Sequence, residues 1–426
     1  MTGPERSGGI GHQRAAPSGP LRHSPADVVV VRDGPADMVI RDGPADMVVR
    51  RGPGDVVVTG IAALSAFGPD AAALAAGVAA GVPAFRPIER FDVSARRTGV
   101  AATLPGSPVL ADELARLIGE ACDEARLRAG DRAGTPLFLA VHGDPDLARA
   151  SDDDRAGHGA GAFAAGLAVR TGLGAASRAY TSACVAASTA VADAAAMVAR
   201  GLLDRVVVAA GYLVDADQFA LFDAGRALAV DGQVRPFSEG RRGLLLGDGA
   251  GAVVVESAAA ARQRGAPPVA RLAGWGRAGD AYHACQPHPH GAGMARAIAA
   301  ALHRGGIAPD AVGYVNAHGS GTAQSDTAET SALRTALGEH AGVVPVSSTK
   351  ALHGQALEAS GVLELVVTAQ ALRAGRLPVN AGFLAADETC RLNLILDSPA
   401  PAGPAYALSL NAAFGGANTA LLIGAT

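Results

Sequence analysis

Short apolar runs and longer helical segments alternate along the chain from residue 55 onwards. The short runs, rich in β-branched or small apolar residues, predict buried strands at residues 55–63, 137–141, 204–210, 250–256, 269–275, 313–317, 406–410 and 419–423. The longer segments predict helices at residues 110–128, 186–200, 293–304, 326–337 and 357–373. Strands that alternate with helices throughout a chain indicate an α/β layer architecture.

Two of these helices carry few polar residues on any side. Residues 186–200 are almost wholly small and apolar, and Gly201 stands where it can cap that helix. Residues 357–373 form a second long apolar segment. Because a helix that is apolar on nearly every side has to be buried, we expect both to lie in the centre of the fold.

The first 54 residues follow a different pattern. Residues 32–40 and 41–49 are near copies, residues 51–58 echo them, and prolines recur at a constant spacing at Pro35, Pro44 and Pro53. A β-solenoid needs about three or more such units to bury a face. We therefore interpret residues 1–54 as a low-complexity, repeat-containing and disordered tail, or as an over-extended start with the native one at Met38 or Met47.

Composition excludes several classes of protein. The 426 residues are 49% hydrophobic and 18% charged, which is too apolar for a disordered chain. A net charge of −4 without a dense Lys/Arg stripe argues against nucleic acid and anionic lipid as partners. No apolar run reaches the roughly 18 residues that a membrane span needs. The four cysteines lie far apart, which argues against a disulfide framework and favours a reducing cytoplasm.

A cysteine stands at the junction between a polar turn and the first of the two apolar helices. The segment 180–188 reads Tyr-Thr-Ser-Ala-Cys-Val-Ala-Ala-Ser, with Cys184 at its centre. Unpaired N–H groups and the helix dipole favour a thiolate at such a position. From local sequence alone, a nucleophile and a structural buried cysteine are equally good interpretations.

Three further segments carry polar residues among small ones. His318, with Asp326 and Glu329 beyond it, ends a predicted buried strand and is suited to act as a donor or base beside a thiolate. Without the cysteine, a core histidine that bonds to backbone groups would be the better interpretation of His318. The segment 347–364 contains Lys350, His353, Gln355 and Glu364, and 411–418 reads Asn-Ala-Ala-Phe-Gly-Gly-Ala-Asn, where backbone amides can approach a substrate oxygen.

In this order, the four segments resemble the β-ketoacyl-[acyl-carrier-protein] synthases, or ketosynthases, of fatty acid and type II polyketide assembly. The resemblance covers about residues 55–426. It implies a thiolase-like α/β fold made of two similar halves in a five-layered αβαβα arrangement. We expect an N-terminal half over residues 55–300, which carries the nucleophile, and a C-terminal half over residues 301–426.

The resemblance also implies roles for single residues. Cys184 stands where the family has its acyl-accepting nucleophile, and His318 where it has the first active-site histidine. Lys350 and Glu364 match a supporting ion pair. Phe414 matches the gating phenylalanine, whose amide is expected to form the oxyanion hole with that of Cys184. The substrate-binding positions implied by the same motifs are Thr322, Gly415 and Gly416.

The chain departs from the family at the second active-site histidine. Elongating members have a histidine after the glycine that matches Gly354, and this chain has Gln355. A glutamine amide can donate a hydrogen bond to a thioester oxygen but cannot exchange a proton. The initiating branch uses an asparagine in this role, so Gln355 is a plausible replacement. His353 is expected to point elsewhere.

Other departures concern the surroundings of the site. Asp248 replaces a glutamate, Arg242 replaces an aspartate, and Ala412 and Ala413 stand before the gate, where Ala413 should stiffen the loop. Residues 283–290 contain His and Cys but match no closed zinc motif. Residues 247–251 lack the lysine of a phosphate loop, so their glycines are better explained by tight packing.

The sequence therefore predicts a cytoplasmic acyltransferase that needs no metal or organic cofactor. It is expected to condense a Cys184-bound acyl chain with a malonyl group on acyl carrier protein, as a homodimer or a heterodimer with a second ketosynthase-like subunit. Arg241 and Arg242 are the expected docking residues for the carrier. Two alternatives stay open: an acyltransferase or thioesterase that acts through Cys184 without elongation, and a chain-length-factor-like subunit.

Overall fold

The computed structural model describes residues 55–145, 147, 158–397, 400–401 and 405–426. The repeat-containing tail expected over residues 1–54 lies outside the described residues. No helix among the described residues is both long enough and apolar enough to span a bilayer.

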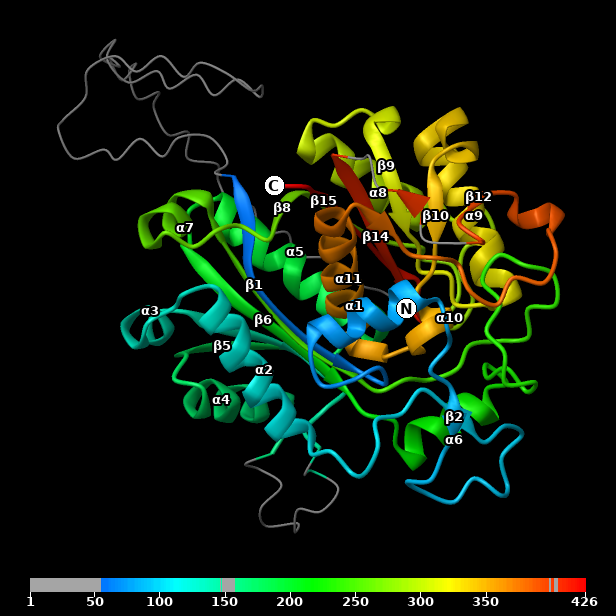
Figure 1. Cartoon of the computed structure of the whole chain (residues 1–426), viewed down its shortest axis with the longest axis horizontal. Coiled ribbons are helices and arrows are strands. Elements are labelled where there is room, and N and C mark those ends of the chain that lie inside the picture. Colours follow the sequence, from blue (N-terminus) through cyan, green and yellow to red (C-terminus); the bar gives the residue numbers. More distant parts are fainter. Residues whose placement is uncertain (1–54, 146, 148–157, 398–399, 402–404) are drawn as a thin grey trace, which may run out of the picture. The chain divides into compact units, whose positions relative to one another are not determined.

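Ten strands form two sets of five with the same internal arrangement (Figure 1). The first set has the spatial order β1-β7-β6-β4-β5 and the second has the order β8-β15-β14-β9-β10. In each set the first two pairings are antiparallel and the last two are parallel. The bounds of the first set are β1 (Val56–Ser65), β4 (Pro136–Ala140), β5 (Gly174–Tyr180), β6 (Arg205–Tyr212) and β7 (Gly249–Ser257). Those of the second are β8 (Ala270–Gly279), β9 (Val312–Asn316), β10 (Pro345–Ser347), β14 (Tyr406–Ala413) and β15 (Ala417–Gly424).

The two strand sets meet through a short antiparallel pairing of β1 with β8, at Val57 and Val58 opposite Arg271 and Ala270. The second set begins at Ala270. The matching strand order places the division between β7 and β8. The short strands are β2 (Arg86–Pro87), β3 (Val100–Ala101), β11 (Arg376–Leu377), β12 (Asn393–Leu394) and β13 (Ala400–Pro401).

Six helices complete the layers on and between the strand sets. The helices α2 (Leu110–Glu124) and α4 (Ala160–Arg170) pack on the first set, and α8 (Ala292–Gly305) and α9 (Ala323–Leu337) pack on the second. Between them lie α5 (Ala186–Ala199) and α11 (Ser360–Ala374), which contact each other and strands of both sets (Figure 1). The expected five-layered, thiolase-like α/β fold with two similar halves is thereby confirmed. The remaining helices are α1 (Ala71–Ala80), α3 (Ala129–Ala133), α6 (Ala216–Ala224), α7 (Ala258–Arg264) and α10 (Lys350–His353).

Small side chains allow α5 and α11 to cross closely in the central layer. A methyl group built on Gly361 of α11 would lie 2.6 Å from the backbone nitrogen of Ser188 in α5. Ser188 in turn bonds to Thr419 of β15 through their hydroxyl oxygens, 2.7 Å apart. Gly201 follows α5 with φ +62°, as expected for a glycine that ends a helix. Both predicted central helices are therefore confirmed as buried.

Candidate active site

Cys184 lies where the chain turns from β5 into α5. A 3-10 turn, η3 (Ala183–Val185), stands between the strand and the helix. Ala183 has φ +51°, a left-handed conformation that is costly for a residue with a Cβ. Such a sharp turn sets the cysteine just ahead of the first turn of α5, where backbone N–H groups are free to meet negative charge.

The Cys184 thiol is nevertheless held in its protonated form. Burial raises its pKa to about 11, and the carboxylate of Glu358 contributes to the rise. A hydrogen bond from the Gln355 side chain and the charge of Lys350 act in the opposite direction. Since burial is the largest of these effects, the resting sulfur is a thiol at neutral pH. The helix start favours negative charge on this sulfur, and burial outweighs that preference in the resting state.

Gln355 reaches Cys184 from a segment that is fixed by its backbone. The backbone nitrogen of Gln355 donates to the carbonyl oxygen of Leu245 at 2.8 Å. The backbone carbonyl oxygen of Gln355 accepts from the backbone nitrogen of Gly247 at 3.0 Å. A methyl group on Gly247 would lie 2.1 Å from the His353 carbonyl oxygen, so only glycine allows the two segments to pass this closely. The Gln355 side chain is buried, and its Oε1 has no hydrogen-bond partner among the described residues.

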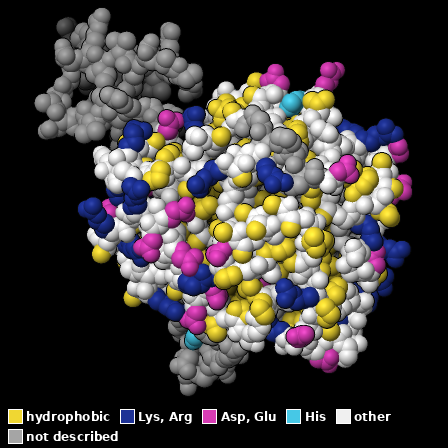
Figure 2. Space-filling model, viewed as in Figure 1, with side chains coloured by type: hydrophobic (Ala, Val, Ile, Leu, Met, Phe, Trp, Pro, Cys, Tyr) yellow, Lys and Arg dark blue, Asp and Glu magenta, His cyan; other side chains and the backbone are white. Residues whose placement is uncertain are grey.

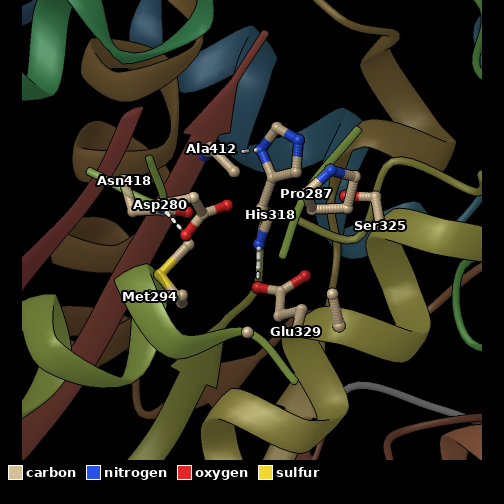
Figure 3. Close-up of a pocket in the computed structure, with 10 residues that line it drawn as sticks. Asp280, Pro287, Met294, His318, Ser325, Glu329, Ala412 and Asn418 are labelled. Carbon is tan, nitrogen blue, oxygen red and sulfur yellow. Dashed lines mark hydrogen bonds between the residues drawn. The ribbon is translucent and has the colours of Figure 1, made fainter. Parts of the chain in front are cut away.

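His318 follows β9 and presents one ring nitrogen as a donor. Its Nδ1 accepts a hydrogen bond from the Ala412 amide at 3.2 Å, so the ring proton of the neutral imidazole resides on Nε2 (Figure 3). Burial, followed by the charge of Lys350, lowers the pKa of His318 well below its ordinary value. The imidazole is therefore neutral and can donate from Nε2.

Two carboxylates of α9 hold the loop that carries His318. Glu329 accepts from the backbone nitrogens of His318 and Gly319, both at 2.7 Å. Asp326 accepts from Gly321 at 3.1 Å and from Phe237 at 2.8 Å. Burial raises the pKa of each carboxyl group to about 7, although these hydrogen bonds oppose the rise. Sequence reasoning noted both residues but gave them no task.

Lys350 and Glu364 form a buried ion pair, as the resemblance implied. Glu364 also accepts a hydrogen bond from the side-chain nitrogen Nδ2 of Asn411 at 2.5 Å, which links α11 to the end of β14. Burial raises the pKa of Glu364, and the Lys350 charge lowers it. The same lysine charge influences both Cys184 and His318, so the three groups share one electrostatic environment.

His353 does not face the sulfur. Its Nδ1 lies 2.9 Å from the Gly354 carbonyl oxygen and its Nε2 lies 3.0 Å from the Thr349 hydroxyl, so both ring nitrogens are occupied. Burial lowers the pKa of His353 to about 4. The expectation that this histidine points elsewhere is met by these two hydrogen bonds.

Phe414 opens the turn between β14 and β15 and is 53% exposed. Its ring centroid lies 6.0 Å from that of Phe222. The next two amides are occupied, since Gly415 donates to Ala284 at 2.7 Å and Gly416 donates to Ala413 at 3.1 Å. Both glycines have positive φ, which fits the tight turn.

Thr322 stands before α9, and its hydroxyl lies 3.0 Å from that of Ser320. A small cavity of about 20 Å³ lies against His318, next to Asp280, Met294 and Asn418 (Figure 3). Asp280 accepts from the amide nitrogen of Asn418 at 3.0 Å, which fixes that wall. Neither Cys184 nor Gln355 lines this cavity.

Other sequence-based interpretations can now be placed. His283 and His288 accept hydrogen bonds from nearby backbone nitrogens, so their rings shape the 280–291 loop. Asp248 accepts from Arg90 at 2.7 Å and from two backbone amides, which makes it a structural anchor. Arg241 is only 5% exposed and bonds to Asp387 at 2.8 Å, so the expectation that it docks a carrier is wrong. Arg242 is exposed.

Figure 2 shows acidic and basic side chains mixed over one face, without a continuous basic stripe. Sequence reasoning missed Glu358, whose charge acts on Cys184, and His142, which contacts Glu358. The sequence signal for Glu358 was that it is the one charged residue in the run 356–361, whose other members are small or apolar. His142 has no sequence signal of its own, because only the fold brings it to Glu358.

Known proteins share this chain's sequence and fold. Models of the β-ketoacyl synthase N-terminal and C-terminal domains match residues 112–261 and 269–384. The 3-oxoacyl-[acyl-carrier-protein] synthase 2 of Staphylococcus aureus is 35% identical over 250 residues, which are 57% of this chain and 62% of that protein. The chain thus matches less than two thirds of the length of this curated relative.

Solved structures extend the similarity over most of the described residues. A β-ketoacyl synthase from Burkholderia phymatum STM815 superposes with a TM-score of 0.80 at 26% identity, over 88% of this chain and 100% of that one. AntDE:AntF, a type II PKS acyl-carrier protein in complex with its ketosynthase, gives a TM-score of 0.79 at 26% identity with the same coverage. Together with the two domain models, these matches show that the chain belongs to the β-ketoacyl synthase family.

Proposed function

We propose that this chain is a β-ketoacyl-[acyl-carrier-protein] synthase that carries out a decarboxylative Claisen condensation in polyketide or fatty acid biosynthesis. The observation that carries the proposal is that the buried Cys184 thiol and a neutral His318, whose free ring nitrogen is a donor, share the charge of Lys350, while the Gln355 side chain lowers the pKa of the same thiol. Together they supply a nucleophile and two hydrogen-bond donors in a water-poor site, which is what acyl transfer followed by enolate formation requires.

In the first half-reaction Cys184 attacks the thioester carbonyl of an acyl carrier. The new carbon–sulfur bond forms at Sγ, the bond to the carrier sulfur breaks, and the thiol proton leaves with the emptied carrier. The backbone amides of Cys184 and Phe414 would hold the oxyanion of the tetrahedral intermediate. Phe414 suits this role because it stands at an exposed turn at the end of β14.

In the second half-reaction a malonyl carrier loses carbon dioxide, and the electron pair becomes an enolate. His318 Nε2 and the Gln355 amide would donate hydrogen bonds to the enolate oxygen. Lys350 and Glu364 would keep His318 neutral and correctly placed, because the Lys350 charge adds to the lowering of its pKa. The carbanion then attacks the carbonyl of the Cys184 thioester: the new carbon–carbon bond forms, the carbon–sulfur bond to Cys184 breaks, and the sulfur takes up a proton from solvent as the β-ketoacyl carrier leaves.

The remaining assignments belong to the same proposal. Thr322, Gly415 and Gly416 would contact the substrate near Phe414. They would do so through polar atoms that are not used in the hydrogen bonds described above. Acyl carrier protein, loaded with acyl or malonyl groups, would be the partner, within a homodimer or a heterodimer with a ketosynthase-like subunit. The reaction needs no metal or organic cofactor, and we propose the cytoplasm as its location.

A second candidate is acyl transfer or thioester hydrolysis through Cys184 without elongation. Gln355 favours it, since an amide cannot exchange a proton as an imidazole does. A chain-length-factor-like role is less well supported, because Cys184 is retained. Malonyl carrier labelled in its free carboxylate separates the candidates. A condensing enzyme loaded with an acyl group releases labelled carbon dioxide together with β-ketoacyl carrier, whereas release of neither product would contradict the proposal.

A further inference from the structure

Glu358 is a buried carboxylate beside the nucleophile. It lies in a 3-10 turn, η6 (Leu357–Ala359), which precedes α11 and packs against η3 with Cys184. The residue is 2% exposed, and its Oε2 has no hydrogen-bond partner among the described residues. A buried carboxylate oxygen without a partner is costly. The cost of keeping this oxygen without a partner indicates that Glu358 has a functional role.

The other oxygen of Glu358 is connected to solvent through an imidazole. Glu358 Oε1 lies 3.3 Å from Nδ1 of His142, which follows β4. The amide nitrogen of Gln218 in α6 lies 2.8 Å from His142 Nε2 and donates to it, so the ring proton resides on Nδ1 and faces Glu358. The His142 side chain is 63% exposed.

The charge of Glu358 reaches the sulfur. It adds to the burial that raises the pKa of Cys184, which is a thiol at neutral pH and therefore needs a proton acceptor before it can attack a carbonyl. Gln355 touches the same thiol but cannot take its proton. His318 Nδ1 is already bonded to Ala412, and the ring offers only a donor at Nε2.

The other ionisable groups around Glu358 do not replace it. Tyr212, at the end of β6, is buried and has its pKa raised by burial first, with Glu358 among the lesser causes. Lys350 is already paired with Glu364. Of the described groups around Cys184, Glu358 is thus the only carboxylate whose second oxygen remains unpartnered.

We propose that Glu358 is the proton acceptor for Cys184 and that His142 links it to solvent. This inference rests on the proposed acyl transfer. As Sγ bonds to the acyl carbon, the S–H proton passes to Glu358 Oε2, directly or through one water. When the carbon–sulfur bond to the carrier breaks, the same proton goes to the departing thiolate, and Glu358 is a carboxylate again. If the departing thiolate takes its proton from solvent instead, Glu358 keeps the S–H proton and passes it through His142 to solvent, which returns Glu358 to the carboxylate form.

The test compares Glu358→Gln with wild type in two reactions of the same sulfur. The first is acylation of Cys184 by an acyl carrier, followed by intact mass at neutral pH. The second is alkylation by iodoacetamide as a function of pH. Removing a neighbouring negative charge favours the thiolate, so the alkylation midpoint should move to lower pH. Loss of the proton acceptor should slow acylation by about 100-fold.

These opposite signs distinguish the proposal from simple repulsion between charges. If Glu358 only repelled the thiolate, Glu358→Gln would acylate as fast as wild type or faster, and that result would overturn the inference. A melting temperature close to that of wild type, measured by differential scanning calorimetry, shows that the variant is folded, since an unfolded chain would also lower the alkylation midpoint. Glu339→Gln, which changes an exposed glutamate in a 3-10 turn remote along the chain, is the matched control and should leave both reactions unchanged.

A second variant tests the link to solvent at an exposed position. His142→Gln retains a side chain that can bond to Glu358 but cannot carry a proton, and acylation should slow by about 10-fold. Acylation at the wild-type rate would remove His142 from the inference. Failure of wild type itself to take up an acyl group would contradict the proposed function instead, so the two failures are distinguishable.

Discussion

At the scale of single residues, the reactivity of Cys184 depends on groups that surround a buried sulfur. Burial raises its pKa to about 11, and the Gln355 hydrogen bond is the first effect that opposes the rise. The amide therefore has two tasks in this account. It stabilises negative charge on the sulfur before acylation and on the enolate oxygen after it.

Replacing Gln355 by alanine should make Cys184 less reactive. A hydrogen bond to the sulfur is worth about 1 kcal/mol, so its loss should slow alkylation by iodoacetamide about fivefold at neutral pH. The midpoint of the pH–rate curve should move upwards. Gln233→Ala, at an exposed position, serves as the control. An unchanged curve for Gln355→Ala would show that the amide does not contact the thiol in solution.

The sequence indicated the catalytic candidates but not their environment. Cys184, His318, Lys350 and Glu364 could be picked out because their segments carry characteristic neighbours. The protonated state of Cys184 could not be predicted, since it depends on how deeply distant segments bury the sulfur. Arg241 was misplaced for the same reason: its burial results from Asp387 and Asp326, which come from other parts of the chain.

At the scale of elements, the crossing of α5 and α11 positions the site. Gly361→Ala would place a methyl group 2.6 Å from the Ser188 nitrogen, and backbone atoms cannot move aside as a flexible side chain can. We expect a loss of about 1–3 kcal/mol in unfolding free energy, measured by denaturant titration. Gly119→Ala in α2, where the methyl group meets nothing within 4 Å, should be neutral or slightly stabilising. Equal effects of the two substitutions would contradict the close crossing.

The hydrogen bonds from the backbone of His318 and Gly319 to Glu329 of α9 predict a pH dependence of stability. Burial raises the folded-state pKa of Glu329 from 4.5 to about 7, so the folded protein binds this proton more tightly than the unfolded chain does. Its contribution is complete below pH 4.5 and is lost as pH rises to about 7. Glu329→Gln should remove this part of the fall in melting temperature between pH 5 and pH 7.5. An undiminished fall in the variant would assign the effect to other groups.

Most strands and helices could be predicted from apolar runs, but their junctions could not. The segment 357–373 was expected to be one helix, and the structure divides it into η6 and α11. Leu357 has φ +40°, which no α-helical residue adopts. This turn, η6, directs Glu358 towards the site. The local residue types do not indicate that a turn forms here.

At the scale of the whole molecule, the two strand sets repeat one order and one pattern of pairing directions. The sequence carries no visible repeat between them, so the two similar halves were predicted from the family resemblance alone. The equivalence appears only in the topology, because many different apolar sequences fill the same strand positions.

Both strand sets and all the proposed catalytic groups lie within residues 55–426. A chain that begins with an added methionine before Asp55 should therefore keep its melting temperature and the acylation of Cys184. Differential scanning calorimetry and intact mass would measure the two. A large loss of either would show that residues 1–54 contribute to the folded body, against the proposed division of the chain.

The central claim is that Cys184 carries the acyl group and passes it to a malonyl-derived carbanion. Peptide mapping by mass spectrometry after a short exposure to acyl carrier tests it most directly, because Cys122, Cys285 and Cys390 are internal controls. The account predicts an acyl adduct on Cys184 alone, which disappears when malonyl carrier is added as β-ketoacyl carrier forms. An adduct on the exposed Cys285 instead, or one on Cys184 that malonyl carrier leaves unchanged, would contradict the account.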